Sequence, residues 1–206
     1  MPPAAGLVEN EYVFYGPQAQ EGTYTIKLTK GKETYSSEVK LVPDPRSKST
    51  PADRELQHKT VTQLYDMLAQ LTYVVDATSE LHEQAKQRAA AASDDKLKDQ
   101  LNGLAQKLEE FRSSLVAVKE GGMITGEKRL REDLGELYGA VNGYSGRPTQ
   151  SQVESTAVLL KKLDEAGAQF QSIASSQIPA LNTALQGKQL EPLKATSRQD
   201  WDKKQK

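Results

Sequence analysis

The segment from Pro51 to Ala89 constrains the fold of this chain more than any other. It contains no proline or glycine after Pro51, and its apolar residues recur at spacings of three and four, which predicts one amphipathic helix. At 1.5 Å per residue the helix would be roughly 55 to 60 Å long, so we expect the other elements to lie along it. A proline-rich linker, 46–50, precedes it, with Thr50 as the N-cap. The apolar stripe consists of Val61, Leu64, Leu68, Leu71, Val75, Thr78, His82 and Ala85, widened by Met67, Val74 and Leu81.

Two further helices are expected between residues 93 and 146. Ser93, Asp94 and Asp95 can cap the first of them, and Gly121-Gly122 would end it. Its seam alternates spacings of four and three, as in a left-handed bundle, and consists of Leu97, Leu101, Leu104, Leu108, Phe111, Leu115 and Val118. The next helix would be short, with Thr125 as its cap and a seam of Leu130, Leu134, Leu137, Val141 and Tyr144.

A fourth helix is expected from Thr149, which forms a capping-box pattern with Gln152. Pro179 would kink this helix without ending it, because the apolar stripe continues beyond it. Gly167 lies on the expected seam and would allow a close approach, so that Gly167→Leu would overpack the bundle. The seam consists of Val153, Thr156, Leu160, Leu163, Gly167, Phe170, Ala174, Ile178, Leu181 and Leu185.

The chain is therefore expected to be mainly α with a small β part, and residues 51–185 to form an elongated up-down-up-down four-helix bundle. On this path the start of the first helix meets the end of the fourth, which would place Leu56 near Leu181. Residues 186–206, around the lone Trp201, would form a polar tail. The tail holds six Lys or Arg and three Asp or Glu, a net charge of +3 that is more typical of solubility than of a binding patch.

Residues 1–45 are expected to be strands of an incomplete, immunoglobulin-like β-sandwich. Glu11–Tyr15 is a short strand candidate, and the alternating runs 23–29 and 33–42 would form a hairpin around a Lys30-Gly31 turn. Because three strands with so few inward residues cannot close a sandwich, we expect this part to belong to a larger sheet. One face of the hairpin would carry Tyr24, Ile26 and Leu28.

Composition limits the classes of function. Lys and Arg number 27 against 28 Asp and Glu, so the formal net charge of -1 offers no field for nucleic acid or an anionic membrane. The absence of cysteine excludes a disulfide, a thiolate zinc site and a thiol nucleophile. Met1–Gly6 lacks the pattern of a signal peptide, and no window approaches eighteen apolar residues, so we expect no membrane span. The sequence does not indicate the cellular compartment of the chain.

Metal and cofactor sites are not expected. His82 lies on the seam of the first helix near Glu80 and Glu83, but the seams of the other helices contain no acidic residue to complete a carboxylate metal site. A structural or rim histidine is the better interpretation. His58 has polar neighbours and is expected to be exposed, and two histidines without cysteine leave little for zinc.

No catalytic constellation is visible either. Gly121-Gly122 and the 143–146 glycines follow no strand and lack the Lys-Ser/Thr pair of a phosphate-binding loop, so they are interpreted as turns between helices. Glu109-Glu110 and Asp94-Asp95 are paired carboxylates, but acid-base catalysis requires an apolar cleft that raises one pKa, and helix-surface carboxylates are solvated. No serine has a Gly-x-Ser-x-Gly setting. We therefore expect no enzyme activity from this chain.

Several structural motifs resemble the C-terminal region of bacterial BNR-repeat, sortilin-like β-propeller proteins. They are Glu21–Leu28 (EGTYTIKL), Gly31-Lys32, Val42–Arg46 (VPDPR), Leu64–Asp66 (LYD) and Gly143–Thr149 (GYSGRPT). The resemblance implies a small β-sandwich that leads into helices, preceded in the family by propellers with Asp-box repeats. Members are often labelled glycosyl hydrolase or sialidase-like, but no Asp box occurs here, so no active residue carries over. The resemblance also implies an exported, periplasmic or secreted parent protein.

Three functions remain open at this point. The first is a non-catalytic accessory module that packs on its own upstream propeller or on another protein. The second is a fragment of a glycosyl hydrolase, sialidase-like or peptidase-like hydrolase whose active site lies in a missing propeller. The third is a free-standing helical adaptor that binds a partner helix through surplus apolar surface on its first and fourth helices.

Overall fold

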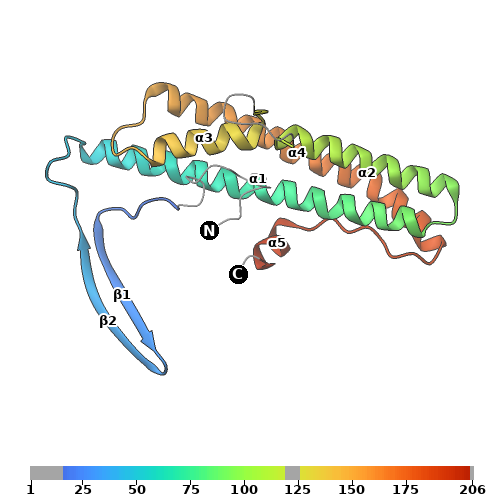
Figure 1. Ribbon diagram of the computed structural model, residues 1–206, viewed down its shortest axis with the longest axis horizontal. Helices are drawn as coiled ribbons and strands as arrows, with labels where there is room; N and C mark the ends of the chain where they lie inside the picture. Colours follow the sequence, from blue (N-terminus) through green and yellow to red (C-terminus); the bar gives the residue numbers. More distant parts are fainter. Residues whose placement is uncertain (1–15, 119–125, 205–206) are drawn as a thin grey trace.

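The computed structural model of the chain describes residues 16–118 and 126–204 (Figure 1). The chain is mainly helical with one antiparallel hairpin ahead of the helices, which confirms the expected class. The strand expected at Glu11–Tyr15 and the turn at Gly121-Gly122 lie outside these ranges. Within them, no helix is long and apolar enough to cross a membrane. The elements are β1 (Gly22–Lys30), β2 (Glu33–Leu41), α1 (Pro51–Ala91), α2 (Asp95–Leu115), α3 (Leu130–Asn142), α4 (Gln150–Gly187) and α5 (Arg198–Lys204).

α1 begins where the sequence predicts it. Thr50 Oγ1 accepts the Asp53 N–H at 3.2 Å, and Asp53 Oδ2 accepts the Thr50 N–H at 3.1 Å, so both halves of a capping box are present. Pro51 occupies the first helical position, where a backbone donor would have no helical partner. The predicted stripe is buried except at His82, which is partly exposed, and α1 is the element on which the others pack.

α2 ends earlier than the sequence suggests. Asp94 caps its start as expected, but the helix stops at Leu115. Beyond it the Ala117 N–H donates to Glu132 of α3 at 3.2 Å, because the chain has already left the helical path. Val118, expected on the seam, is consequently 47% exposed, and its assignment to the core is wrong.

α3 has different ends from those expected. Its N-cap is Arg129, whose backbone N–H donates to Glu132 at 3.1 Å, and not Thr125. Glu132 is the N3 residue, and its carboxylate accepts the N-cap N–H as the Glu of a capping box does. Tyr144 lies beyond the last turn and is 65% exposed, whereas Tyr138, which the heptad assignment missed, is fully buried.

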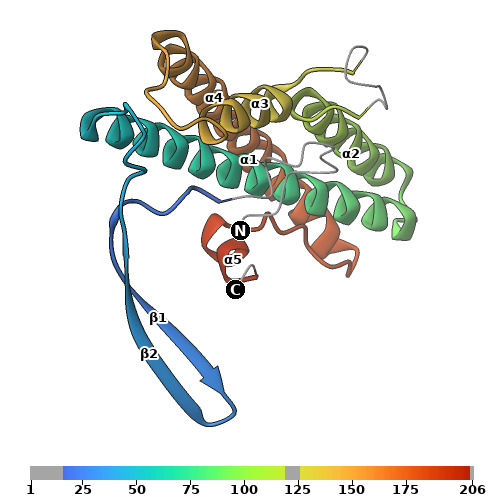
Figure 2. The same cartoon turned by 60° about the vertical axis from the view of Figure 1, so that its left-hand side comes forward.

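The helices do not follow an up-down-up-down path. α2 and α3 lie one after the other along α1 and run antiparallel to it, while α4 runs parallel to α1 (Figures 1 and 2). Gln57 Nε2 of α1 donates to the Val141 carbonyl at 3.0 Å, so α3 ends beside the start of α1. At the other end, Lys188 forms an ion pair with Asp94 at 3.4 Å, so α4 ends beside the end of α1.

The predicted proximity of Leu56 and Leu181 is therefore wrong. The neighbours of Leu181 in α4, Ala180 and Thr183, line a cleft together with Leu97 at the start of α2. A heptad pattern fixes which face of a helix is buried but not its direction. α1 has 41 residues, and α2 and α3 have 21 and 13, so one long helix accommodates two short ones in line.

α4 starts at the predicted Thr149 cap and continues through Pro179 as expected. Gly167 is not a close-packing position, because a Cβ atom there would meet no atom within 4 Å. The expectation that Gly167→Leu overpacks the core is thus wrong. A straight helix drifts away from a strict heptad, which shifted the assigned seam. The buried residues are Thr156, Leu159, Leu163, Ala166, Phe170, Ile173, Leu181 and Leu185.

β1 and β2 form the expected hairpin, with the turn one residue later than predicted. Lys30 pairs with Glu33, so the two-residue loop is Gly31-Lys32. Gly31 has a φ of 63°, a left-handed conformation that glycine adopts without steric cost.

Residues 186–204, the described part of the expected polar tail, do not form one. α4 extends to Gly187, after which the chain reverses and runs back along α1 to α5 (Figure 1). Leu193 and Trp201 are only 2% and 3% exposed. The charged majority of the segment obscured these two apolar anchors in the sequence.

Candidate functional site

His82 links two helices. Its Nδ1 lies 2.9 Å from the Ala105 carbonyl oxygen of α2, and since a carbonyl only accepts, Nδ1 carries the proton. Its Nε2 lies 3.5 Å from Glu83. Glu80 faces another way and accepts from Thr196 and from Lys204 Nζ. These groups do not converge, and the described residues contain no cluster of three metal-ligating side chains.

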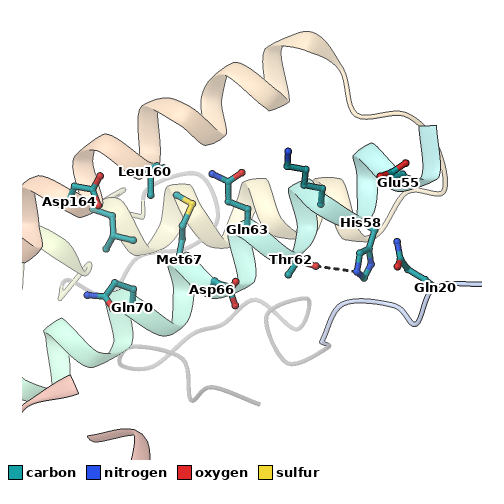
Figure 3. Close-up of a pocket in the computed structure, with 12 residues that line it drawn as sticks. Gln20, Glu55, His58, Thr62, Gln63, Asp66, Met67, Gln70, Leu160 and Asp164 are labelled. Atoms are coloured by element: carbon teal, nitrogen blue, oxygen red, sulfur yellow. Dashed lines mark hydrogen bonds between the residues drawn. The ribbon is translucent and has the colours of Figure 1, made fainter. Parts of the chain in front are cut away.

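His58 lines an open cleft of about 850 Å³ between α1 and α4. Figure 3 shows that most of the lining side chains come from α1, with Leu160 and Asp164 from α4 and Gln20 from the segment before β1. His58 is partly buried, not exposed as expected, and its Nε2 lies 3.4 Å from the Thr62 hydroxyl. That distance is long for a hydrogen bond, and in residues 16–118 and 126–204 no carboxylate forms an ion pair with the ring to orient it.

The paired carboxylates serve the helices. Asp94 Oδ1 accepts the Leu97 N–H, and this hydrogen bond lowers the pKa of the Asp94 carboxyl. The Arg112 guanidinium lowers the pKa of Glu109, to which it donates at 2.7 and 2.9 Å. Both carboxylates are held ionised, whereas a general acid needs a raised pKa. A lowered pKa makes Asp94 and Glu109 poorly suited to act as general acids.

Asp76 is a partly buried polar position that the sequence did not reveal. Burial raises the pKa of its carboxyl, and the Trp201 Nε1–H donates to it at 2.9 Å. The two residues are 125 positions apart, so no local pattern could have joined them. The available signal was a lone tryptophan in a polar segment, since a side chain of that size is rarely left in water.

Several exposed apolar side chains lie together on the hairpin. Paired residues in an antiparallel ladder share a face, and β1 and β2 pair so that their apolar residues fall on the same side. Ile26, Leu28 and Tyr35 are 55%, 63% and 54% exposed. We call this surface the apolar hairpin face; it consists of Tyr24, Ile26, Leu28, Tyr35, Val39 and Leu41.

The hairpin extends away from the helices, and its free edges are exposed along its length (Figures 1 and 2). An ion pair of 2.8 Å between Glu21 and Arg54 joins its base to α1. Within the described ranges the sheet has two strands, so each strand has one edge without a paired neighbour. Exposed edges and an apolar face are the features through which another β element pairs and packs.

The fold and this surface define a class of protein, a helical bundle that presents a β-hairpin. No family model, no curated protein and no solved structure matches the chain. The resemblance to BNR-repeat proteins therefore depends on the motifs quoted above.

Proposed function

We propose that this chain is a non-catalytic interaction module, the C-terminal accessory part of a BNR-repeat β-propeller protein. In this proposal the hairpin completes a β-sheet of its own upstream β structure or of another protein. The observation that carries the proposal is the apolar hairpin face, which the helices of the same chain leave exposed. The motifs of β1 and of the Asp44–Arg46 turn supply the choice of parent family.

The apolar hairpin face is costly to leave in water. Burying a large apolar side chain contributes roughly 1.5 to 3 kcal/mol, and Ile26, Leu28 and Tyr35 are each more than half exposed. Strand addition to either edge would also satisfy backbone groups. A lone hairpin is marginally stable, so it gains order as well as affinity when a sheet receives it.

The test measures hydrogen exchange in the chain alone and in the chain joined to the segment encoded upstream of it. We expect the amides of 22–41 to exchange fast in the chain alone and slowly in the joined protein. The double variant Ile26→Lys, Leu28→Lys should abolish the slowing, and Thr25→Lys, on the opposite face, should keep it. Exchange of 22–41 as slow as that of α1 in the isolated chain would contradict the proposal.

The hydrolase alternative is tested by turnover. The described residues offer a solvated cleft and ionised surface carboxylates, so we propose no activity on sialosides, glycans or peptides. Reproducible turnover by the purified chain would overturn the non-catalytic proposal. The helical-adaptor alternative has less support than the hairpin, because Leu193 and Trp201 already cover apolar surface of α1 and α4.

A further inference from the structure

The C-terminal segment runs back along α1 (Figures 1 and 2). Side chains of α1 and α4 form hydrogen bonds with its backbone. We call residues 190–204 the tail segment. The tail groove consists of Tyr73, Asp76, Gln84 and Arg88 of α1 and Asn182 of α4.

Two side-chain amides clamp neighbouring residues of the tail segment. Asn182 accepts the Leu193 N–H at 2.7 Å and donates to the Leu193 carbonyl at 2.9 Å. Gln84, on the other helix, accepts the Lys194 N–H at 2.8 Å and donates to the Lys194 carbonyl at 3.0 Å. Each clamp satisfies the donor and the acceptor of one residue, as a paired strand would.

Two more groove residues also donate hydrogen bonds to the backbone of the tail segment. Arg88 Nε donates to the Glu191 carbonyl at 2.9 Å, and the Tyr73 hydroxyl donates to the Thr196 carbonyl at 3.1 Å. These hydrogen bonds hold the backbone of the tail segment in place, and Arg88 Nη2 adds an ion pair with the Glu191 carboxylate at 2.6 Å. The tail groove therefore holds the extended part of the tail segment mainly through its backbone.

Two anchors set the register of the bound segment. The Leu193 side chain is 2% exposed, and the Trp201 side chain is 3% exposed. The Trp201 ring packs edge-on against Tyr73 at a centroid distance of 6.1 Å, and its Nε1–H reaches Asp76. Such buried aromatic anchors contribute most of the affinity and specificity of a peptide site.

The connection between α4 and the tail segment is short and strained. Gln189 has a φ of 58° and is the one non-glycine residue with positive φ in the described part of the chain. The Leu190 N–H donates to the Leu185 carbonyl at 3.0 Å, which makes this turn a Schellman motif with Gln189 at the position that normally holds glycine. A side chain in this conformation is costly, and short strained hinges favour exchange of an element between chains.

We propose that the tail groove also binds the tail segment of a second copy of this chain, by reciprocal domain swapping about a hinge at Lys188-Gln189. The contacts of the groove are identical in the closed and the swapped form, so they do not favour either. An extended hinge releases the left-handed conformation of Gln189 in both chains of the dimer, which favours the swap, while the high local concentration of the tethered tail favours the monomer. We therefore expect a dimer whose population rises with protein concentration.

The test uses the full chain and two hinge variants in sedimentation equilibrium. Gln189→Pro cannot adopt positive φ and should lower the dimer dissociation constant by about tenfold or more. Gln189→Gly relaxes the closed turn and should raise the constant by about tenfold or more, since each dimer contains two hinges. Trp201, the one tryptophan of the chain, reports on the groove, and its emission should stay blue-shifted in the dimer.

Several outcomes would overturn the proposal. One is a monomeric Gln189→Pro chain, whether its Trp201 emission is native or red-shifted. Another is a dimer with exposed Trp201, and a third is a dimer that Ile26→Lys dissolves, since that dimer would form through the apolar hairpin face. If Gln189→Pro loses its helical circular dichroism, the comparison of Gln189→Gly with the wild type decides, and equal dissociation constants would then exclude the swap.

Discussion

Asp76 lies under the tail segment, where burial raises the pKa of its carboxyl although the Trp201 Nε1–H and Lys204 act in the opposite direction. A raised pKa means that the folded chain binds a proton more tightly than the unfolded chain does. Ionisation of Asp76 therefore lowers the free energy of unfolding as pH rises from the ordinary aspartate value toward the raised folded value. Docking the tail segment on α1 therefore carries the free-energy cost of partly burying the Asp76 carboxylate.

Asp76→Asn keeps an acceptor for Trp201 and removes the charge. We expect the variant to be at least as stable as the wild type at pH 7, with the difference in unfolding free energy shrinking below about pH 4, where the wild-type carboxyl is protonated. Urea unfolding of both chains between pH 3 and 7 measures this difference directly. A variant that becomes progressively less stable than the wild type as pH rises would contradict the assignment.

Truncating a buried core residue should lower the free energy of unfolding far more than truncating a residue that the heptad pattern wrongly placed in the core. Leu108 has no exposed surface, and Leu108→Ala should lower the free energy of unfolding by roughly 2 to 5 kcal/mol through the cavity it leaves. Val118 belongs to the same predicted heptad but is 47% exposed, so Val118→Ala should change stability by less than about 0.5 kcal/mol. Thermal unfolding followed by circular dichroism compares the two. A similar loss for both would show that the predicted heptad, and not the observed end of α2, defines the core.

At the scale of elements, Gly167 lowers the stability of α4, and no close packing compensates for this loss. A Cβ at Gly167 meets nothing within 4 Å, so Gly167→Ala should raise the free energy of unfolding by roughly 0.8 to 1 kcal/mol through helix propensity. Gly143 is the matched contrast, because a Cβ there would lie 2.9 Å from the Gly139 carbonyl oxygen. Gly143→Ala should therefore fail to stabilise the chain. Denaturant unfolding of the two variants checks the difference in sign.

The sequence predicted the starts of α1, α2 and α4 but missed the start of α3 and the end of α2, for a physical reason. Caps such as Thr50, Asp94 and Thr149 bond to backbone groups three residues away, so the necessary information is local. The end of α2 depends on a carboxylate of α3, Glu132, which no pattern inside α2 could reveal. The direction of α3 and α4 was equally hidden, since apolar periodicity is the same whichever way a helix runs.

The same limit applies to the candidate sites. The exposed face of the hairpin could be predicted, because strand alternation fixes which residues lie together. The tail groove could not, since it joins Gln84 to Lys194 and Asp76 to Trp201 across more than a hundred residues. Side-chain amides on helix surfaces are common and carry no sequence signal of a backbone clamp.

At the scale of the whole molecule, the chain divides into parts of different local stability. The long helices share one buried core, the tail segment is held by two anchors and a row of backbone hydrogen bonds, and the hairpin lies outside the core. Opening free energies follow buried apolar contact. Amide exchange should therefore be slowest in α1, α2 and α4, intermediate in 190–201 and fastest in 22–41.

Asn182→Ala tests this order within the full chain. Loss of both hydrogen bonds to Leu193 should speed exchange throughout the tail segment and shift Trp201 emission toward longer wavelengths, because the segment undocks as a unit. The core of α1 and α2, which does not need the tail to form its seam, should keep its protection. Thr183→Ala is the control, since this neighbouring hydroxyl is exposed and bonds within its own helix, to Pro179. If Asn182→Ala instead speeds exchange equally in the core and in the tail, the tail segment is a cooperative part of the bundle and cannot exchange without global unfolding.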